Sequence, residues 1–164
     1  MGSLNIRAAR AEDLGAINAI YNYFVLNSTC TYQTEPETEA SRAQWFVNHG
    51  EKHPITVGEV DGEVVAWGSL SRFHARAAYG RTVENSVYVH PEFHRRGYGR
   101  LILADLIERA RGLGHHAIIA GIDAEQRASV ALHAGAGFVE VGLLREVGFK
   151  FGRWLHVIYM ELVL

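Results

Sequence analysis

The chain has 164 residues, of which 48% are hydrophobic and 21% are charged, a composition typical of a single globular domain. Its 16 Lys and Arg nearly balance 18 Asp and Glu, which leaves a net charge of −2. This balance excludes the positive surplus that non-specific nucleic-acid binding requires. No apolar run approaches the roughly 18 residues of a membrane span, and the first residues lack a signal-peptide core. We therefore expect one cytoplasmic domain, residues 1–164, with no nucleic-acid or membrane partner.

Cysteine and histidine usage argues against a metal site. Cys30 is the only cysteine, so an internal disulfide framework and a cysteine-based zinc site are excluded. His90 and His94 are four residues apart, but a proline follows the first and a glycine turn follows the second, so they do not form a helical ligand pair. His115 and His116 are adjacent on a predicted strand and point to opposite faces. We expect no bound metal ion.

The N-terminal half predicts a strand, two helices and a hairpin. Leu14, Ile17 and Ile20 recur at helical spacing, and Asp61-Gly62 is a two-residue hairpin signal between apolar runs. The polar and aromatic stretch Arg72–Gly80 predicts a loop over a site. The expected elements are a strand at Asn5–Ala8, a helix at Asp13–Leu26, a helix capped by Thr38 and ending near Gly50, and strands at Ile55–Val60 and Glu63–Leu70.

The C-terminal half alternates strands with helices and ends in two strands. In the stretch Thr82–Val89 a period of two places Glu84, Ser86 and Tyr88 on one face, opposite the valines and Asn85. Strands that alternate with helices indicate a mixed α/β domain in one layered unit. The expected elements are a strand at Thr82–Val89, a helix at Gly97–Leu113, a strand at Ala117–Ile122, a helix at Gln126–Ala134, and strands at Phe138–Glu146 and Arg153–Leu162.

A glycine-containing turn, His94-Arg95-Arg96-Gly97-Tyr98-Gly99-Arg100, connects the strand to the long helix. Glycines allow backbone amides to approach an anion, and the first-turn amides and helix dipole favour negative charge. The turn therefore predicts a phosphate or pyrophosphate site. A structural turn with positive φ remains the alternative. Ile102 stands where the dinucleotide fingerprint needs a third small residue, and no Gly-Lys-Ser/Thr sequence provides a P-loop.

This turn resembles the pyrophosphate motif of the GCN5-related N-acetyltransferase superfamily, Gln/Arg-x-x-Gly-x-Gly/Ala, with His94 in place of the usual Gln or Arg. A narrower resemblance, to the phosphinothricin and methionine sulfoximine N-acetyltransferases, covers nearly the whole chain. It rests on these segments in the same order: Ile20-Tyr21-Asn22, Thr34-Glu35-Pro36, Ala75-Arg76-x-Ala78-Tyr79, Thr82-Val83-Glu84-x-Ser86-Val87-Tyr88-Val89 and Gly148-Phe149-Lys150-x-Gly152-x-Trp154.

The resemblance implies a mixed, mostly antiparallel twisted sheet with helices on both faces and splayed central strands. Acetyl-CoA is the implied cosubstrate, and the acetyl acceptor is the α-amino group of phosphinothricin, methionine sulfoximine or methionine sulfone. A homodimer is also implied, with Phe149–Tyr159 as part of the contact. The residues expected to bind acetyl-CoA are Val87, Val89, His94, Arg95, Arg96, Gly97, Tyr98, Gly99, Arg100, Gln126 and Ser129.

Three residues are expected to act in acetyl transfer. Glu84 is the candidate general base, because a carboxylate within an apolar strand is costly unless it is solvated, paired or functional. A solvent-facing Glu or an ion-pair partner is the alternative. By resemblance, the Val89 amide stabilises the oxyanion at a bulge in its strand. His133 is a candidate acid for the leaving thiolate, or else a structural histidine beside the cofactor.

The acceptor is expected to be bound by Glu84 and by side chains from three other segments. Arg76 offers a bidentate donor and Tyr79 a hydroxyl from the loop before Glu84. Tyr32 lies in an N-terminal loop, and Lys150 matches the C-terminal segment of the resembled enzymes. Two other functions remain open: the same fold and cosubstrate with another amine acceptor (an amino acid, a polyamine or a protein N-terminus), or a non-catalytic acetyl-CoA-binding module.

Overall fold

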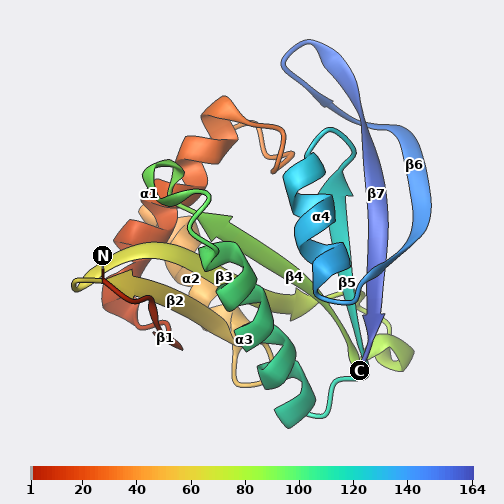
Figure 1. Ribbon diagram of the computed structural model, residues 1–164. Coiled ribbons are helices and arrows are strands. Elements are labelled where there is room, and N and C mark those ends of the chain that lie inside the picture. The colour runs from red at the N-terminus through yellow and green to blue at the C-terminus, as the bar shows by residue number, and fades with distance from the viewer. Residues whose placement is uncertain (1) are drawn as a thin grey trace.

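The computed structural model describes residues 2–164, whose seven strands form one sheet in the order β1-β2-β3-β4-β5-β7-β6 (Figure 1). All neighbouring strands are antiparallel except β4 and β5, which are parallel. The strands are β1 (Asn5–Ala8), β2 (Ile55–Val60), β3 (Glu63–Arg72), β4 (Thr82–Val89), β5 (Ala117–Asp123), β6 (Val139–Lys150) and β7 (Arg153–Val163); the helices are α1 (Leu14–Asn27), α2 (Glu39–His49), α3 (Tyr98–Gly112) and α4 (Arg127–Gly135).

Helices cover both faces of the sheet, as the sequence predicts: α1 and α2 lie on one face, and α3 and α4 lie on the other (Figure 1). Alternation along the strands produces this layering. Ala66 and Leu70 of β3 pack in the cluster that contains α3, whereas Trp67 and Val57 pack against α1. Within residues 2–164 no helix is long and apolar enough to cross a membrane.

Close packing of α3 against β3 depends on Gly68. A Cβ atom at this position would lie 2.6 Å from Ile102 Cγ2 and 2.9 Å from the Ser86 carbonyl oxygen. Such distances are well inside van der Waals contact, so no larger residue fits without displacing the helix. The helix that follows the glycine turn is thereby held directly over the centre of the sheet.

The predicted elements agree with the structure except at two places. A short 3-10 turn at Ala11–Asp13 precedes α1, where the sequence pattern predicts one continuous helix from Asp13. Strand β6 continues to Lys150, four residues beyond its predicted end at Glu146. The reason is a bulge between Leu144 and Gly148, where Glu146 has φ +55°. This conformation interrupts the two-residue periodicity without ending the strand.

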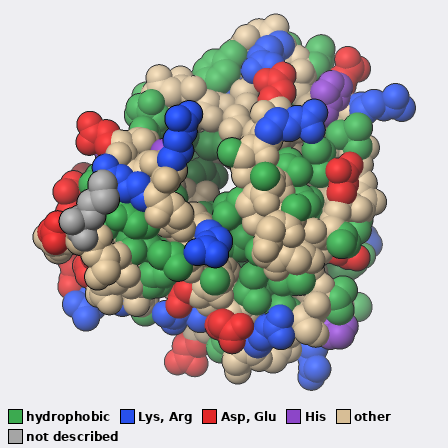
Figure 2. Space-filling model, viewed as in Figure 1, with side chains coloured by type: hydrophobic (Ala, Val, Ile, Leu, Met, Phe, Trp, Pro, Cys, Tyr) green, Lys and Arg blue, Asp and Glu red, His purple; other side chains and the backbone are tan. Residues whose placement is uncertain are grey.

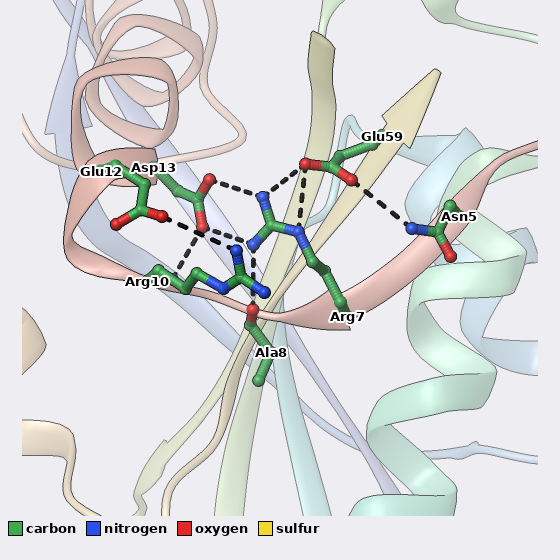
Figure 3. A network of polar contacts seen from close by, with 7 residues as sticks. All are labelled: Asn5, Arg7, Ala8, Arg10, Glu12, Asp13 and Glu59. Carbon is green, nitrogen blue, oxygen red and sulfur yellow. Dashed lines mark hydrogen bonds and ion pairs between the residues drawn. The ribbon is translucent and has the colours of Figure 1, made fainter. Parts of the chain in front are cut away.

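An ion-pair network fixes the edge strand β1 to its surroundings (Figure 3). The Arg7 guanidinium donates to both carboxylate oxygens of Asp13, at 2.7 and 2.8 Å, and to Glu59 on β2. The backbone amide of Arg10 also donates to Asp13, at 2.7 Å. The Arg7 hydrogen bond is the main cause that holds the pKa of Asp13 below its ordinary value, even though this carboxyl is only 5% exposed.

Candidate active site

The site begins where two central strands diverge. The parallel pairing of β4 and β5 extends only from Thr82 and Ala117 to Glu84 and Ile119, after which each strand follows its other neighbour. The divergence leaves a cavity of about 310 Å³, and Figure 2 shows a hollow in this part of the molecule. The cavity is lined by Cys30, Thr31, Tyr32, Glu84, Asn85, Ser86, Val87, Tyr88, Ala120, Gly121, Ile122, Asp123, Ser129, His133, Val157 and Tyr159.

The β4 strand separates the cavity into two walls. Tyr88 packs with the α1 cluster, whereas Val83 and Val87 pack with the α3 cluster, as the predicted alternation requires. Glu84 belongs to the wall on the α1 side, and Asn85 belongs to the wall on the side of α3 and α4. One strand thus presents different chemistry to the two sides of the fork.

Glu84 lies at the apex of the fork and is half-buried. Burial raises the pKa of Glu84, and no charged or hydrogen-bonding partner among residues 2–164 opposes that effect. Gly121 of β5 lies next to it: a Cβ atom there would be 3.4 Å from Glu84 Oε1, which is ordinary van der Waals contact. A carboxylate with a raised pKa and no partner is a better proton acceptor for an amine than an ordinary glutamate.

Tyr32 closes one end of the cavity. Its hydroxyl lies 2.7 Å from the Asp123 carboxylate and 3.0 Å from the carbonyl oxygen of His156. Burial is the main cause that raises the pKa of Tyr32, and the hydrogen bond to Asp123 adds to it. The ring lies against Gly148, where a Cβ atom would be 2.4 Å from Tyr32 Cε2. The β6 glycine therefore determines where this loop residue lies.

Lys150 holds the same loop from behind. Its ammonium donates to the carbonyl oxygens of Ser28 and Thr31, at 2.7 and 2.8 Å, and the residue is 3% exposed. Burial lowers the pKa of Lys150, and the nearby Cys30 thiol opposes that effect. The sequence predicts Lys150 as a substrate ligand, but in this structure its ammonium binds the loop backbone and the residue does not line the cavity.

His133 of α4 lies on the opposite wall and is 4% exposed. Its Nε2 is 2.9 Å from Asn85 Nδ2, and its Nδ1 is 2.8 Å from the carbonyl oxygen of Ser129. Burial lowers the pKa of His133, opposed by the Ser129 carbonyl. The sequence predicts His133 at this wall but does not predict Asn85 as its partner. The available signal is a polar residue among valines on the apolar side of β4.

The glycine turn has the geometry of an anion-binding nest. Arg95 has φ +62° and Gly97 has φ +79°, on either side of Arg96, and α3 begins at Tyr98. Alternating conformations of this kind point successive amides toward one place, at the positive end of the helix dipole. At Gly99 a Cβ atom would be 3.5 Å or more from its neighbours, so a small side chain is tolerated there.

Side chains of the turn mostly bind the turn itself. His94 Nε2 donates to the carbonyl oxygen of Val89 at 2.8 Å, and Arg96 donates to that of Glu92 at 3.2 Å. Tyr98 is buried in the core. The side chains of His94, Arg95, Arg96 and Arg100 are exposed, and of these Arg95 and Arg100 make no hydrogen bond to the turn.

The amides of Val87 and Val89 point into the gap between β4 and β5. The His90 amide donates to Val65 of the β3 side, and successive residues of a strand alternate in direction, so the amides of residues 89 and 87 face away from β3. The expected bulge is not found: the β3–β4 register runs without a shift from Arg72–Val83 to Ala66–Val89. The end of the β4–β5 pairing exposes these amides instead.

Gln126 does not contact the cavity. Its side-chain amide donates to the Thr29 hydroxyl at 3.1 Å, which connects the start of α4 to the loop after α1. Of Gln126 and Ser129, which the sequence predicts as acetyl-CoA ligands, Ser129 lines the cavity.

The loop before β4 lies outside the cavity. Arg76 is exposed, and Tyr79 is 40% exposed, with its ring tilted against His74 and edge-on to Phe73 at centroid distances of 4.8 and 5.8 Å. The sequence predicts Arg76 and Tyr79 as acceptor ligands, but neither lines the cavity of its own chain. The structure instead brings in Tyr88 and Asp123, which the sequence analysis did not select as ligands.

An anion nest beside a forked sheet, with free amides and an unpartnered carboxylate in the fork, fits the diphosphate and thioester of a coenzyme A derivative and an amine acceptor. Among residues 2–164 no three His, Cys, Asp or Glu side chains gather as metal ligands. This arrangement is that of an enzyme that transfers an acyl group to nitrogen. When bound, acetyl-CoA supplies the activated acetyl group.

Comparisons with known proteins agree with this class. The model of the acetyltransferase (GNAT) family matches residues 17–138. A methionine sulfoximine and methionine sulfone acetyltransferase of Pseudomonas aeruginosa is 39% identical over 98% of this chain and 94% of its own. The chain therefore belongs to the GNAT family, and it is an N-acetyltransferase that uses acetyl-CoA.

Two solved structures show the same fold. The phosphinothricin acetyltransferase of Sinorhizobium meliloti, in complex with acetyl-CoA, has a TM-score of 0.95 and 37% identity, covering 98% of this chain and 88% of its own. A ribosomal-protein-alanine N-acetyltransferase of Brucella melitensis has a TM-score of 0.95 and 40% identity, covering 98% of this chain and 99% of its own. The names of these relatives differ in the acceptor.

Proposed function

We propose that this enzyme acetylates the α-amino group of a small amino acid analogue such as phosphinothricin, methionine sulfoximine or methionine sulfone. The observation that carries the proposal is the unpartnered Glu84 carboxyl group in a cavity of about 310 Å³. This volume is at the small end of the range for ligand pockets. The proposal is supported by relatives that align with 98% of this chain and are named for these acceptors.

Glu84 acts as general base in this proposal. An α-ammonium group has no lone pair, so it must lose a proton before it attacks the thioester. Glu84 takes that proton, directly or through a water molecule. Its raised pKa supports the assignment, because burial disfavours the charged carboxylate and so makes it a stronger proton acceptor. The amine then attacks directly, with no acyl-enzyme.

In this proposal backbone amides stabilise the oxyanion of the reaction and the pyrophosphate of acetyl-CoA. The Val89 amide stabilises the oxyanion, and the Val87 amide holds the pantetheine part of acetyl-CoA within the gap. The amides from Arg95 to Gly99 bind the pyrophosphate, with Arg95 and Arg100 adding positive charge. The positive φ angles of the nest support the role of the turn. The alternation of the strand, which turns the amides of residues 87 and 89 toward the gap, supports the roles of Val87 and Val89.

Recognition of an anionic acceptor needs a cation that the cavity itself does not supply. Its lining includes the carboxylates of Glu84 and Asp123 but no arginine or lysine of residues 2–164. Arg76 and Tyr79 supply the missing donors from the exposed loop, across the interface of a homodimer. Tyr32 lines the acceptor side, and Lys150 keeps the Tyr32 loop in position through backbone contacts.

The homodimer forms through β6. This strand is at the edge of the sheet, and an apolar edge strand invites pairing with another chain. The Trp154 side chain beside it on β7 is 59% exposed. Equilibrium sedimentation is expected to give twice the chain mass, and Leu143→Lys to give a monomer with weaker acceptor binding. The exposed apolar residues of β6 and the adjoining turn are Val139, Val141, Leu143, Leu144, Val147, Phe149 and Phe151.

The whole chain, residues 1–164, acts as one domain in the cytoplasm under this proposal. Support comes from the single continuous sheet and from Cys30, a free thiol in a sequence with no second cysteine. Burial raises the pKa of the Cys30 thiol, which keeps it protonated and unreactive.

The test is release of free thiol from acetyl-CoA with a panel of acceptors: phosphinothricin, methionine sulfoximine, methionine sulfone, ordinary amino acids, spermidine and a peptide with N-terminal alanine. Turnover concentrated on the three analogues, and lost in Glu84→Gln, is the expected result. A preference for spermidine contradicts the proposal. Acetyl-CoA binding without turnover of any acceptor would indicate a binding module.

A protein N-terminus is the second candidate acceptor. The observation in its favour is the 40% identity to the Brucella melitensis protein, whose name gives ribosomal-protein alanine as the acceptor. The peptide in the panel separates the two candidates. A kcat/KM at least about tenfold higher for the peptide than for the analogues, equivalent to about 1.4 kcal/mol in transition-state binding, would establish this alternative.

A further inference from the structure

Asn85 and His133 meet on the cofactor side of the cavity although they are 48 residues apart in sequence. Asn85 is 8% exposed and His133 is 4% exposed. Among residues 2–164 the Asn85 side chain makes one hydrogen bond, from its Nδ2 to His133 Nε2, at 2.9 Å. The pair therefore forms a buried polar unit in an otherwise apolar wall.

The partners define the tautomer of His133. A carboxamide nitrogen only donates hydrogen bonds, so Nε2 must be the acceptor. The carbonyl oxygen of Ser129 only accepts, so Nδ1 must carry the proton. His133 is thus a neutral imidazole whose Nε2 has a lone pair and no proton. In this state the ring can take up a proton at Nε2 but has none there to give.

The second atom of the Asn85 carboxamide has no partner. Its Oδ1 is buried and accepts no hydrogen bond from residues 2–164. A half-turn of the carboxamide exchanges Nδ2 and Oδ1, and Oδ1 then accepts from a protonated Nε2. This half-turn breaks no other hydrogen bond. The new one is charge-assisted, and such bonds are roughly twice as strong as neutral ones.

We propose that Asn85 is a positioning residue that lets His133 carry a proton between the acceptor nitrogen and the departing sulfur. The proposal rests on the proposed function, because it takes this cavity as the place of acetyl transfer. After Glu84 has removed the first proton and the amine has attacked, an N–H bond of the attacking nitrogen breaks and an Nε2–H bond forms. The C–S bond then breaks, with its electron pair on sulfur. The Nε2–H bond breaks, an S–H bond forms, and His133 is neutral again.

The surroundings of His133 keep its imidazole neutral at rest. The other titratable groups that line the cavity are Glu84 on β4, Asp123 on β5, Tyr159 on β7, and Cys30 and Tyr32 on the loop after α1, with Tyr88 also on β4. None of them shifts the pKa of His133, which burial lowers and the Ser129 carbonyl raises. A neutral resting ring follows, and Asn85 is the only side chain that hydrogen-bonds it among residues 2–164.

The first test is NMR of the protein labelled with [15N]histidine, recorded without substrates. The wild type is expected to show the neutral Nδ1–H tautomer for His133 at pH 7.5. Asn85→Leu removes both hydrogen-bonding atoms at similar size, so the pKa of His133 is expected to fall further. Asn85→Asp places a carboxylate beside the ring and is expected to raise that pKa. An Nε2–H tautomer or an imidazolium in the wild type at pH 7.5 overturns the proposal.

The second test is the kinetics of the same variants. Asn85→Leu is expected to lower kcat about tenfold or more, with less than about a twofold change in the KM for acetyl-CoA. Asn85→Asp is expected to move the acid limb of the pH–rate profile to higher pH. Asn27→Leu is the control, because Asn27 is exposed and donates only to Tyr23 of its own helix. It should change neither the rate nor the spectrum.

The outcomes separate this inference from the proposed function. An unchanged kcat in a folded Asn85→Leu protein, shown by a native NMR spectrum, contradicts the inference. Full activity in Glu84→Gln contradicts the assigned base but leaves the His133 tautomer as observed, because the NMR measurement does not require turnover.

Discussion

Asp13 is a buried carboxyl group and Glu84 a half-buried one, and their surroundings differ in almost every respect. Asp13 accepts two hydrogen bonds from Arg7 and one from the Arg10 amide, and its pKa is lowered. Glu84 lies in the fork between β4 and β5, where burial alone raises its pKa. The first carboxyl group stabilises the fold in its charged form, and the second is destabilised in that form.

The difference shows how a fold can hold a reactive group. A carboxylate whose burial is offset by hydrogen bonds and a cation stays charged and contributes to the stability of the fold. An uncompensated carboxylate keeps its tendency to bind a proton, which is what a general base needs. Asp123, in the same cavity as Glu84, resembles Asp13 in being hydrogen-bonded, through Tyr32 and the Glu125 amide.

The largest effect is expected from Glu84→Gln. The amide keeps the shape but cannot accept a proton from the amine, so kcat should fall about a hundredfold or more. The melting temperature should not fall, because no partner is lost and the cost of a buried charge is removed. Steady-state kinetics and calorimetry on the same preparation measure both quantities. Glu63→Gln, at an exposed residue of β3, is the control.

Asp13→Asn is expected to have the reverse consequences. It removes one of the two charged partners of Arg7 and leaves Glu59 as the other, so the free energy of unfolding should fall by about 2 kcal/mol. The kcat of the folded protein should be unchanged, because Asp13 lies at the β1 edge and not in the cavity (Figure 3). Urea unfolding measures the loss. Glu12→Gln, at a neighbouring exposed carboxyl group, should cost less than about 0.5 kcal/mol; an equal loss in both variants would refute the comparison.

The two groups are also expected to give opposite dependences of stability on pH. Glu84 has a raised pKa, so its contribution is full below its ordinary value of 4.5 and is lost as pH rises through the raised value. Asp13 has a lowered pKa, so its contribution is full above its ordinary value of 3.8 and is lost as pH falls through the lowered value.

Urea unfolding of the wild type and both variants between pH 2 and pH 8 tests this sign. The difference between the wild type and Glu84→Gln should appear above about pH 4.5, and that between the wild type and Asp13→Asn should shrink below about pH 3.8. Parallel curves for the three proteins would show that neither carboxyl group has a shifted pKa.

The smallest effect is expected from Tyr32→Phe, which changes Asp123 from a hydrogen-bonded carboxylate toward the state of Glu84. Loss of the 2.7 Å hydrogen bond should cost about 1 kcal/mol of stability. It should lower kcat/KM for the acceptor several-fold and leave the KM for acetyl-CoA unchanged. Tyr23→Phe, at an exposed tyrosine of α1, is the control. A change in the KM for acetyl-CoA alone would contradict the assignment of Tyr32 to the acceptor side of the cavity.

Local patterns in the sequence were sufficient for the elements that frame the site. The alternation in β4, the glycine turn and the amphipathic stripe of α3 are each encoded within a few consecutive residues. They predict that Glu84 and Asn85 face opposite sides and that the turn binds an anion. The sequence predicts too short a β6, because the bulge between Leu144 and Gly148 interrupts the alternation of apolar residues on which the prediction rests.

The contacts that define the site depend on segments far apart in the sequence. Tyr32 and Asp123 are 91 residues apart, and Lys150 binds a carbonyl group 122 residues away. No local pattern shows that Lys150 faces a loop backbone, or that Arg76 lies outside the cavity of its own chain. Such positions follow from strand order and register, which are properties of the whole sheet.

The sequence by itself therefore determined the order of elements, the glycine turn before α3 and the identity of the carboxylate in the central strand, because short-range periodicity and glycine geometry are local properties. The tertiary structure alone decided that β4 and β5 part at Glu84, that the Glu84 carboxyl group lies beside Gly121 in the fork, and that Asn85 faces His133. The physical reason is that burial and hydrogen-bond partners, which set the chemistry of a side chain, are fixed only when distant segments pack together.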